Sequence, residues 1–245
     1  IPGRLELYGQ SGADALAAYG ELTGMVLPLL TLPSALLMAV SVSLVPEISQ
    51  ACAGSQTTHI RRTVSVTMLF TAIIGIGAAC VYAVFPREIC YIVYGRSSLG
   101  GLLFPLAFLC PLLYAQTTLS GLLNGLGEQL FLFWSHMLSS LITIAFVWFG
   151  IPLYGLSAFC AGWFCSLLAV FLWSLRRLKQ RTGVIFSIRE CFCKPLLAGG
   201  AAALPVRYGI QILEPSRLLF CGSLVCMGIL YLLFLFLLGC FSKEN

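Results

Sequence analysis

Long apolar runs separated by short polar segments make up most of this chain. Seven runs stand out, at residues 22–45, 64–85, 102–123, 131–149, 156–175, 192–212 and 218–241. Each is close to the roughly 20 apolar residues with which an α-helix crosses a hydrocarbon core of about 30 Å. The pattern predicts an all-α, polytopic integral membrane protein with about seven transmembrane helices. The run at 192–212 is the weakest, because glycines, a proline and an arginine interrupt it.

The first apolar run contains two prolines, Pro28 and Pro33. Each lacks a backbone N–H and pushes its ring against the preceding turn, so the helix should bend there. Neighbouring helices must then satisfy the carbonyls that the bend frees. Broken helices are typical of transporters that rock about a site near the midplane, which makes both prolines hinge candidates. The alternative is that membrane helices simply tolerate proline.

Polar signals mark helix ends between the runs. Ser11-Gly-Ala-Asp14 fits a capping box, in which the serine hydroxyl and the aspartate carboxylate close a helix start. Asn124-Gly-Leu-Gly-Glu128 predicts a turn between two spans.

Composition supports the membrane prediction and excludes several function classes. Apolar residues make up 59% of the chain and charged residues 9%, whereas soluble domains carry about 25% charged residues. The eleven cysteines lie mostly in apolar runs without a C-x-x-C pair, so we expect neither a disulfide framework nor a metal site. No catalytic or phosphate-loop motif is present, and the basic residues lie at membrane ends. We therefore expect no enzyme activity, no cofactor and no nucleic-acid partner.

The distribution of basic residues predicts an orientation. If seven spans alternate, nine Lys and Arg residues lie on one side, including the run from 176 to 194, and five lie on the other. The positive-inside bias makes the first side, with the C-terminus, cytoplasmic. Residues 1–20 then lie outside, and we expect at least one further span before them.

Polar side chains inside the spans are candidates for a site. His136 is an ionisable group well inside the fourth run, and such groups are by default functional hypotheses. Gln116 and Asn124 on the third run are cavity or packing candidates, since hydrogen bonds between helices would also explain them. Gly121-x-x-x-Gly125 fits a face on which two helices approach closely.

The densest basic run follows the fifth apolar run. Its first members are Arg176, Arg177, Lys179 and Arg181. These residues can hold anionic lipid headgroups at the membrane surface or act only as topology determinants.

Several stretches together resemble a known family. They are Ile1-Pro2, Leu22-Thr23-Gly24-Met25, Pro28-Leu29-Leu30, Leu44-Val45-Pro46-Glu47-Ile48-Ser49, Gln116-Thr-Thr-Leu-Ser-Gly-Leu-Leu-Asn-Gly125 and Gly150-Ile-Pro-Leu-Tyr-Gly-Leu-Ser-Ala158. In order and spacing they are similar to the stage V sporulation protein B group, in the polysaccharide-exporter branch of the multidrug/oligosaccharidyl-lipid/polysaccharide flippase superfamily. The resemblance implies the second half of a fourteen-helix protein with two lobes. Residues 1–175 would then be an incomplete second lobe, 176–191 a basic cytoplasmic loop, and 192–245 a terminal helix pair.

The function implied by this resemblance is movement of a lipid-linked oligosaccharide or cell-wall precursor across the cytoplasmic membrane, in spore cortex or envelope synthesis. Membrane lipids and a lipid-linked glycan would be the partners, and the first lobe would be needed to carry the glycan. One alternative is a cation-coupled small-molecule exporter, which would need acids that this chain does not carry deep in a span. Another is a membrane scaffold or truncated remnant that transports nothing.

Overall fold

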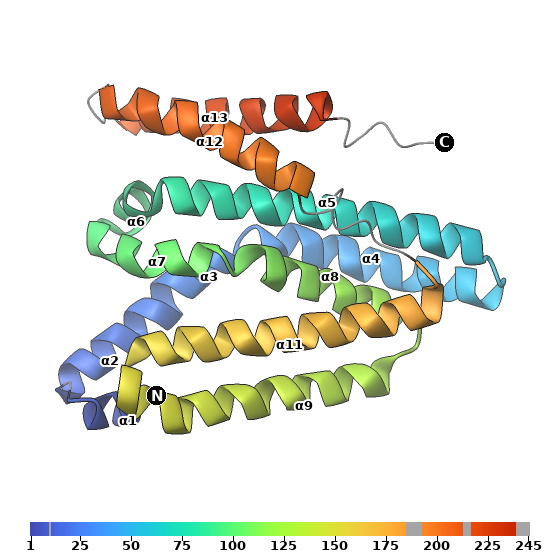
Figure 1. The fold of residues 1–245 in the computed structure, drawn as a ribbon, viewed down its shortest axis with the longest axis horizontal. Helices are drawn as coiled ribbons and strands as arrows, with labels where there is room; N and C mark the ends of the chain where they lie inside the picture. The colour runs from blue at the N-terminus through green and yellow to red at the C-terminus, as the bar shows by residue number, and fades with distance from the viewer. Residues whose placement is uncertain (10, 185–192, 213–216, 239–245) are drawn as a thin grey trace. The chain divides into compact units, whose positions relative to one another are not determined.

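The computed structural model describes residues 1–9, 11–184, 193–212 and 217–238, and every regular element in these ranges is helical (Figure 1). The prediction of an all-α protein is confirmed. The elements are α1 (Pro2–Leu7), α2 (Gly12–Glu21), η1 (Leu22–Val26), α3 (Leu27–Thr31), α4 (Ser34–Ala53), α5 (Thr57–Val84), α6 (Pro86–Tyr94), η2 (Ser97–Leu99), α7 (Gly100–Ala107), α8 (Cys110–Gly125), α9 (Gln129–Ala145), η3 (Phe146–Gly150), α10 (Ile151–Tyr154), α11 (Leu156–Thr182), α12 (Lys194–Ile212) and α13 (Arg217–Leu237).

Four of these helical segments are long and apolar enough to cross a membrane. They are Ser34–Ala53, Thr57–Val84, Gln129–Tyr154 and Leu156–Thr182. A fifth candidate is the pair Ser97–Ala107 and Cys110–Gly125, which is interrupted at Phe108 and Leu109, and Gly222–Leu237 is a shorter apolar helix. The protein is therefore a helical membrane protein. The count of seven spans stays a prediction, and parts of the last two runs and of the basic loop, including Arg189, lie outside the described ranges.

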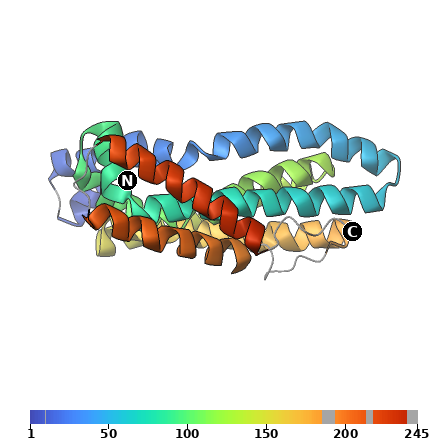
Figure 2. The ribbon, with the colours of Figure 1, turned by 90° about the horizontal axis from the view of Figure 1, so that it is seen from above.

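The chain forms two compact units. One combines Ile1–Thr67 with Leu112–Ile185, and the other combines Met68–Pro111 with Phe186–Asn245. In the first unit the chain turns back from α4 into the first turns of α5 (Figures 1 and 2), and α9 packs along α11 (Figure 1). The residues of the candidate site belong to this first unit.

In the second unit, α12 and α13 pack against each other and against α5. A buried apolar cluster there consists of Ile73, Ala198, Ala202, Tyr231 and Leu235. The Tyr231 hydroxyl donates to the Ile73 carbonyl at 2.9 Å, so the polar end of this buried ring has a partner.

The helix is interrupted between α3 and α4, inside the first apolar run. Pro28 is the second residue of α3 and Pro33 is the N-cap of α4, so the run at 22–45 is not one continuous helix. Side chains satisfy carbonyls around this break. The fully buried Tyr114 of α8 donates its hydroxyl to the Leu30 carbonyl at 2.7 Å, and Ser34 Oγ donates to the Thr31 carbonyl at 2.6 Å. The expectation that a neighbouring helix satisfies a carbonyl at this bend is confirmed.

Local signals act as the sequence predicts at two helix ends. Ser11 Oγ accepts from the Asp14 N–H at 3.2 Å, which confirms Ser11 as the N-cap of α2, and the Ser11 hydroxyl donates to the Asp14 carboxylate at 2.6 Å. The turn at Asn124–Glu128 separates α8 from α9, and Gly127 there has a φ of +77°, which favours glycine. This turn brings Glu128 to the start of α9.

Candidate functional site

Three helices of the first unit enclose a groove of about 450 Å³, which we call the polar groove. Its lining residues come from α4, α8 and α9, and they are Met38, Ser41, Val42, Val45, Leu113, Gln116, Thr117, Ser120, Gly121, Asn124, Leu132 and His136. The three polar residues nominated from the sequence, Gln116, Asn124 and His136, are all among them. They come from two helices and meet in one concavity.

The polar groove contains buried polar atoms that lack partners in the described part of the chain. Gln116 is 9% exposed, and its amide nitrogen is 3.5 Å from Ser120 Oγ. Its Oε1 atom and the hydroxyl of Ser41, 5% exposed, have no hydrogen-bond partner there. An unsatisfied buried polar group costs about 1–3 kcal/mol. These atoms therefore favour a groove that holds water or a polar solute.

α4 and α8 pack closely where Ser41 and Gly121 line the polar groove. A Cβ added at Gly121 would lie 2.6 Å from Ser41 Cβ and 3.2 Å from the Ser41 carbonyl oxygen. A Cβ at Gly125 would lie 3.1 Å from Ile48 Cβ. The predicted small-residue packing face is confirmed, and its partner is α4.

Two opposite sides of α9 line different concavities. Leu132 and His136 are one turn apart and line the polar groove. Trp134 lies two residues from each, about 200° around the helix, and lines a different pocket. Between these faces, Ser139 Oγ lies 2.6 Å from Ser166 Oγ of α11, which holds the two helices together.

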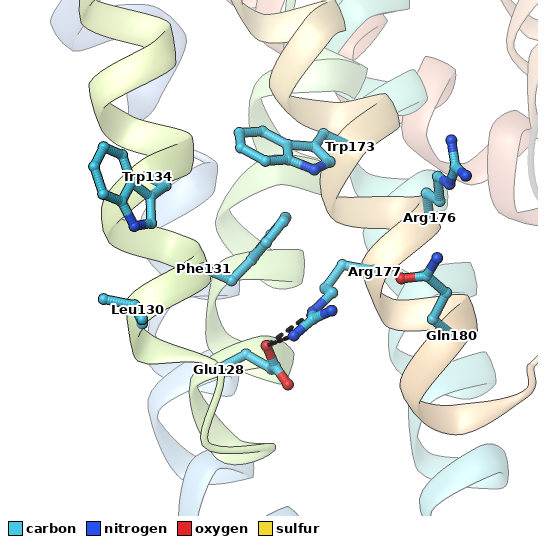
Figure 3. Close-up of a pocket in the computed structure, with 8 residues that line it drawn as sticks. All are labelled: Glu128, Leu130, Phe131, Trp134, Trp173, Arg176, Arg177 and Gln180. Atoms are coloured by element: carbon cyan, nitrogen blue, oxygen red, sulfur yellow. Dashed lines mark hydrogen bonds and ion pairs between the residues drawn. The ribbon is translucent and has the colours of Figure 1, made fainter.

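The second concavity lies where α9 begins and α11 ends (Figure 3). It measures about 490 Å³, and we call it the basic pocket. It is lined by Glu128, Leu130, Phe131, Trp134, Trp173, Arg176, Arg177 and Gln180. Trp173 projects from α11 toward α9, and its ring packs edge-on against Phe131 with centroids 5.0 Å apart (Figure 3).

Glu128 anchors the basic pocket. Glu128 is 6% exposed. Its Oε2 atom accepts from two nitrogens of Arg177, Nε at 2.9 Å and Nη2 at 2.8 Å (Figure 3). Its other oxygen pairs with Arg181. The turn after α8 is thereby tied to the last turns of α11. In the same unit, Arg61 Nε donates to the Thr182 carbonyl at 2.9 Å, which ties α5 to the same end of α11.

The predicted basic residues divide into three environments. Arg177 and Arg181 pair with Glu128. Arg176 is exposed and lines the basic pocket, with no ion pair among the residues that the structure describes. Lys179 is exposed and does not line the pocket. The prolines Pro28 and Pro33 line neither the polar groove nor the basic pocket.

Sequence reasoning missed Ser41, Ser120 and Glu128. Ser41 carries a signal, because it belongs to a short series of serines in an apolar run. Its burial depends on Gly121, which lies in another helix, so spacing along the chain does not reveal it. Glu128 is an isolated acid in a turn, and its partner Arg177 is 49 residues away. Acids that follow a span and precede a distant basic run are the type of signal that would have identified this pair.

Comparisons with known proteins support one similarity. No family model matches the chain, and no solved structure matches it significantly. The chain is 30% identical over 123 residues to stage V sporulation protein B of Bacillus subtilis (strain 168). The match covers 50% of this chain and 24% of the relative, so the chain matches about a quarter of that protein's length. The chain is thus similar to stage V sporulation protein B, as the motifs in its sequence predict.

Proposed function

We propose that this chain supplies one lobe of a membrane transporter, the second lobe of a two-lobed flippase, and that the polar groove is part of its translocation path. The solute is a lipid-linked oligosaccharide or cell-wall precursor, moved across the cytoplasmic membrane. The observation that carries the proposal is a groove between candidate membrane helices with buried Gln116 and Ser41 atoms that lack partners in the described chain. A glycan must keep its hydroxyl groups hydrogen-bonded while it crosses hydrocarbon.

The chemistry of the polar groove suits a neutral polar solute. Its polar lining consists of hydroxyls, two amides and an imidazole, and no carboxylate is among the lining residues in the described ranges. Amides and hydroxyls both donate and accept hydrogen bonds, as sugar hydroxyls do. A cation-coupled exporter would need acids in this wall, so the groove favours the glycan over the cation.

The similarity to stage V sporulation protein B supports a role in sporulation, and the charge distribution supports a cytoplasmic C-terminus. In this arrangement residues 1–175 contribute to the lobe, 176–191 form a basic cytoplasmic loop, and 192–245 form a helix pair beside it. A two-lobed transporter needs an opposite wall, so we expect this chain alone to transport nothing.

The proposed path is tested by replacing its buried amide. We expect Gln116→Leu, introduced into a two-lobed protein that contains this chain, to slow flipping at least about tenfold, because the glycan loses a hydrogen-bonding group in the groove. The assay follows the accessibility of a fluorescent lipid-linked sugar to a membrane-impermeant quencher in liposomes. Gln129→Leu is the matched control, since Gln129 is exposed and lines neither concavity.

A loss of similar size in Gln116→Leu and Gln129→Leu would remove the polar groove from the path. If the unmodified protein leaves the accessibility of the sugar unchanged, the flippase proposal itself is wrong, and the scaffold alternative is favoured.

We further propose that the break at Pro28 and Pro33 acts as a hinge. The break interrupts the helical run directly before α4, which lines the groove. Replacing both prolines with alanine should restore backbone donors and straighten the segment. We expect the double variant to bind the fluorescent lipid-linked sugar normally and to flip it several-fold more slowly. Flipping at the unmodified rate would contradict the hinge.

A further inference from the structure

We propose that the basic pocket binds the phosphodiester headgroup of an anionic membrane phospholipid, at a site separate from the polar groove. The ligand class is defined by three features of the described residues: excess positive charge, aromatic rings beside that charge, and position at the end of two candidate membrane helices.

The positive charge in and beside the pocket exceeds what Glu128 neutralises. Arg177 and Arg181 both pair with the Glu128 carboxylate, and Arg176 lines the same pocket, so the three guanidinium groups carry two positive charges more than this one carboxylate neutralises. Arg176 is exposed and makes no ion pair in the described chain. Its planar guanidinium can bind a phosphate through two parallel hydrogen bonds. Gln180, also exposed in the lining, adds an amide donor.

The aromatic lining places the pocket at the level of lipid headgroups. Trp134 and Trp173 are 54% and 39% exposed, and tryptophan gathers where hydrocarbon meets headgroups. Trp134 lies five residues after Gln129, about 8 Å from the start of the span that begins there. Phosphate and glycerol groups of a lipid occupy this depth, with acyl chains extending toward the membrane centre.

The outer face of α9 is free to contact those acyl chains. Only 6% of the apolar 18-residue stretch within Gln129–Tyr154 is buried inside the protein. Leu130 is 72% exposed and Leu141 61%. The basic pocket opens on the side of α9 opposite His136, so its lipid would not occupy the polar groove. Lipid binding in the basic pocket is therefore independent of transport through the polar groove.

The test measures binding of a phosphatidylglycerol with a fluorescent acyl chain to the detergent-solubilised chain, by fluorescence anisotropy. We expect Arg176→Gln to weaken binding at least about fivefold, because the variant loses the charge-assisted hydrogen bonds from this guanidinium to the phosphate. Lys179→Gln is the matched control, because it removes a nearby exposed charge that does not line the pocket. We expect it to weaken binding less than about twofold, because an exposed charge outside the pocket acts on the headgroup only through solvent that contains salt. Trp134→Ala is a second pocket variant, and we expect it also to weaken binding several-fold.

Competition identifies the ligand. Unlabelled phosphatidylglycerol should displace the probe, whereas phosphatidylcholine and inorganic phosphate should not. Displacement by inorganic phosphate at the concentration effective for phosphatidylglycerol would show a phosphate-ion site and overturn the lipid proposal. Equal losses in Arg176→Gln and Lys179→Gln, or unchanged binding in both pocket variants with helical content retained by circular dichroism, would overturn the assignment to this pocket.

Discussion

Replacing Gly121 with leucine is expected to separate α4 from α8 and to destabilise the first unit by at least about 3 kcal/mol. A Cβ atom at this position would lie 2.6 Å from Ser41 Cβ and 3.2 Å from the Ser41 carbonyl oxygen. Backbone cannot rotate away as the end of a flexible side chain can, so the helices must move apart. Inserting one or two methylenes into a packed core already costs about 1–3 kcal/mol, and leucine adds more. The close contact of Ser41 with residue 121, both of which line the polar groove, should then be lost.

The measurement is thermal unfolding of the purified chain in detergent, followed by circular dichroism and by size-exclusion chromatography after heating. Gly20→Leu is the matched control, because Gly20 is an exposed helical glycine with no atom within 4 Å of an added Cβ. We expect Gly20→Leu to unfold close to the unmodified chain. Equal unfolding of Gly121→Leu and Gly20→Leu would show that α4 and α8 do not pack as described.

Polar residues in apolar runs were the part of the site that the sequence revealed. Gln116, Asn124 and His136 are each a candidate by themselves, because polar groups in hydrocarbon are energetically costly and indicate a structural or functional role. Their meeting in one groove depends on the packing of α8 against α9 and α4. Pairing between distant helices is set by contacts such as Gly121 with Ser41, which no single periodicity encodes.

Hydropathy located the apolar segments better than it located the helix ends. The runs expected to end at residues 45 and 175 continue as helix to Ala53 and Thr182. Polarity marks where a helix leaves hydrocarbon, while its end depends on a local stop such as Gly183, which has a φ of +64°. The run expected at 102–123 is instead interrupted at Phe108 and Leu109. Pro111 explains this interruption, since it cannot donate to the carbonyl four residues earlier.

Replacing Glu128 with glutamine is expected to destabilise the first unit by about 2 kcal/mol. Glutamine has the same shape, but it leaves Arg177 and Arg181 close together without the carboxylate between them. Hydrogen bonds to a charged group contribute about 1.5–3 kcal/mol each. Both arginines are partly exposed, with side chains 35% and 55% accessible, so water recovers part of the loss. The turn between α8 and α9 should consequently loosen from the end of α11.

Glu47→Gln provides the matched control, since Glu47 is an exposed carboxylate that pairs with a histidine, 3.2 Å from His59 Nε2 and with 45% of its side chain accessible. Such pairs contribute about 0–1 kcal/mol, so this variant should unfold nearly as the unmodified chain does. Combining Glu128→Gln with Arg181→Gln removes one of the two facing charges, and the double variant should regain part of the lost stability. Equal stability of Glu128→Gln and Glu47→Gln, or a strictly additive loss in the double variant, would show that the buried carboxylate does not hold α11 to the turn.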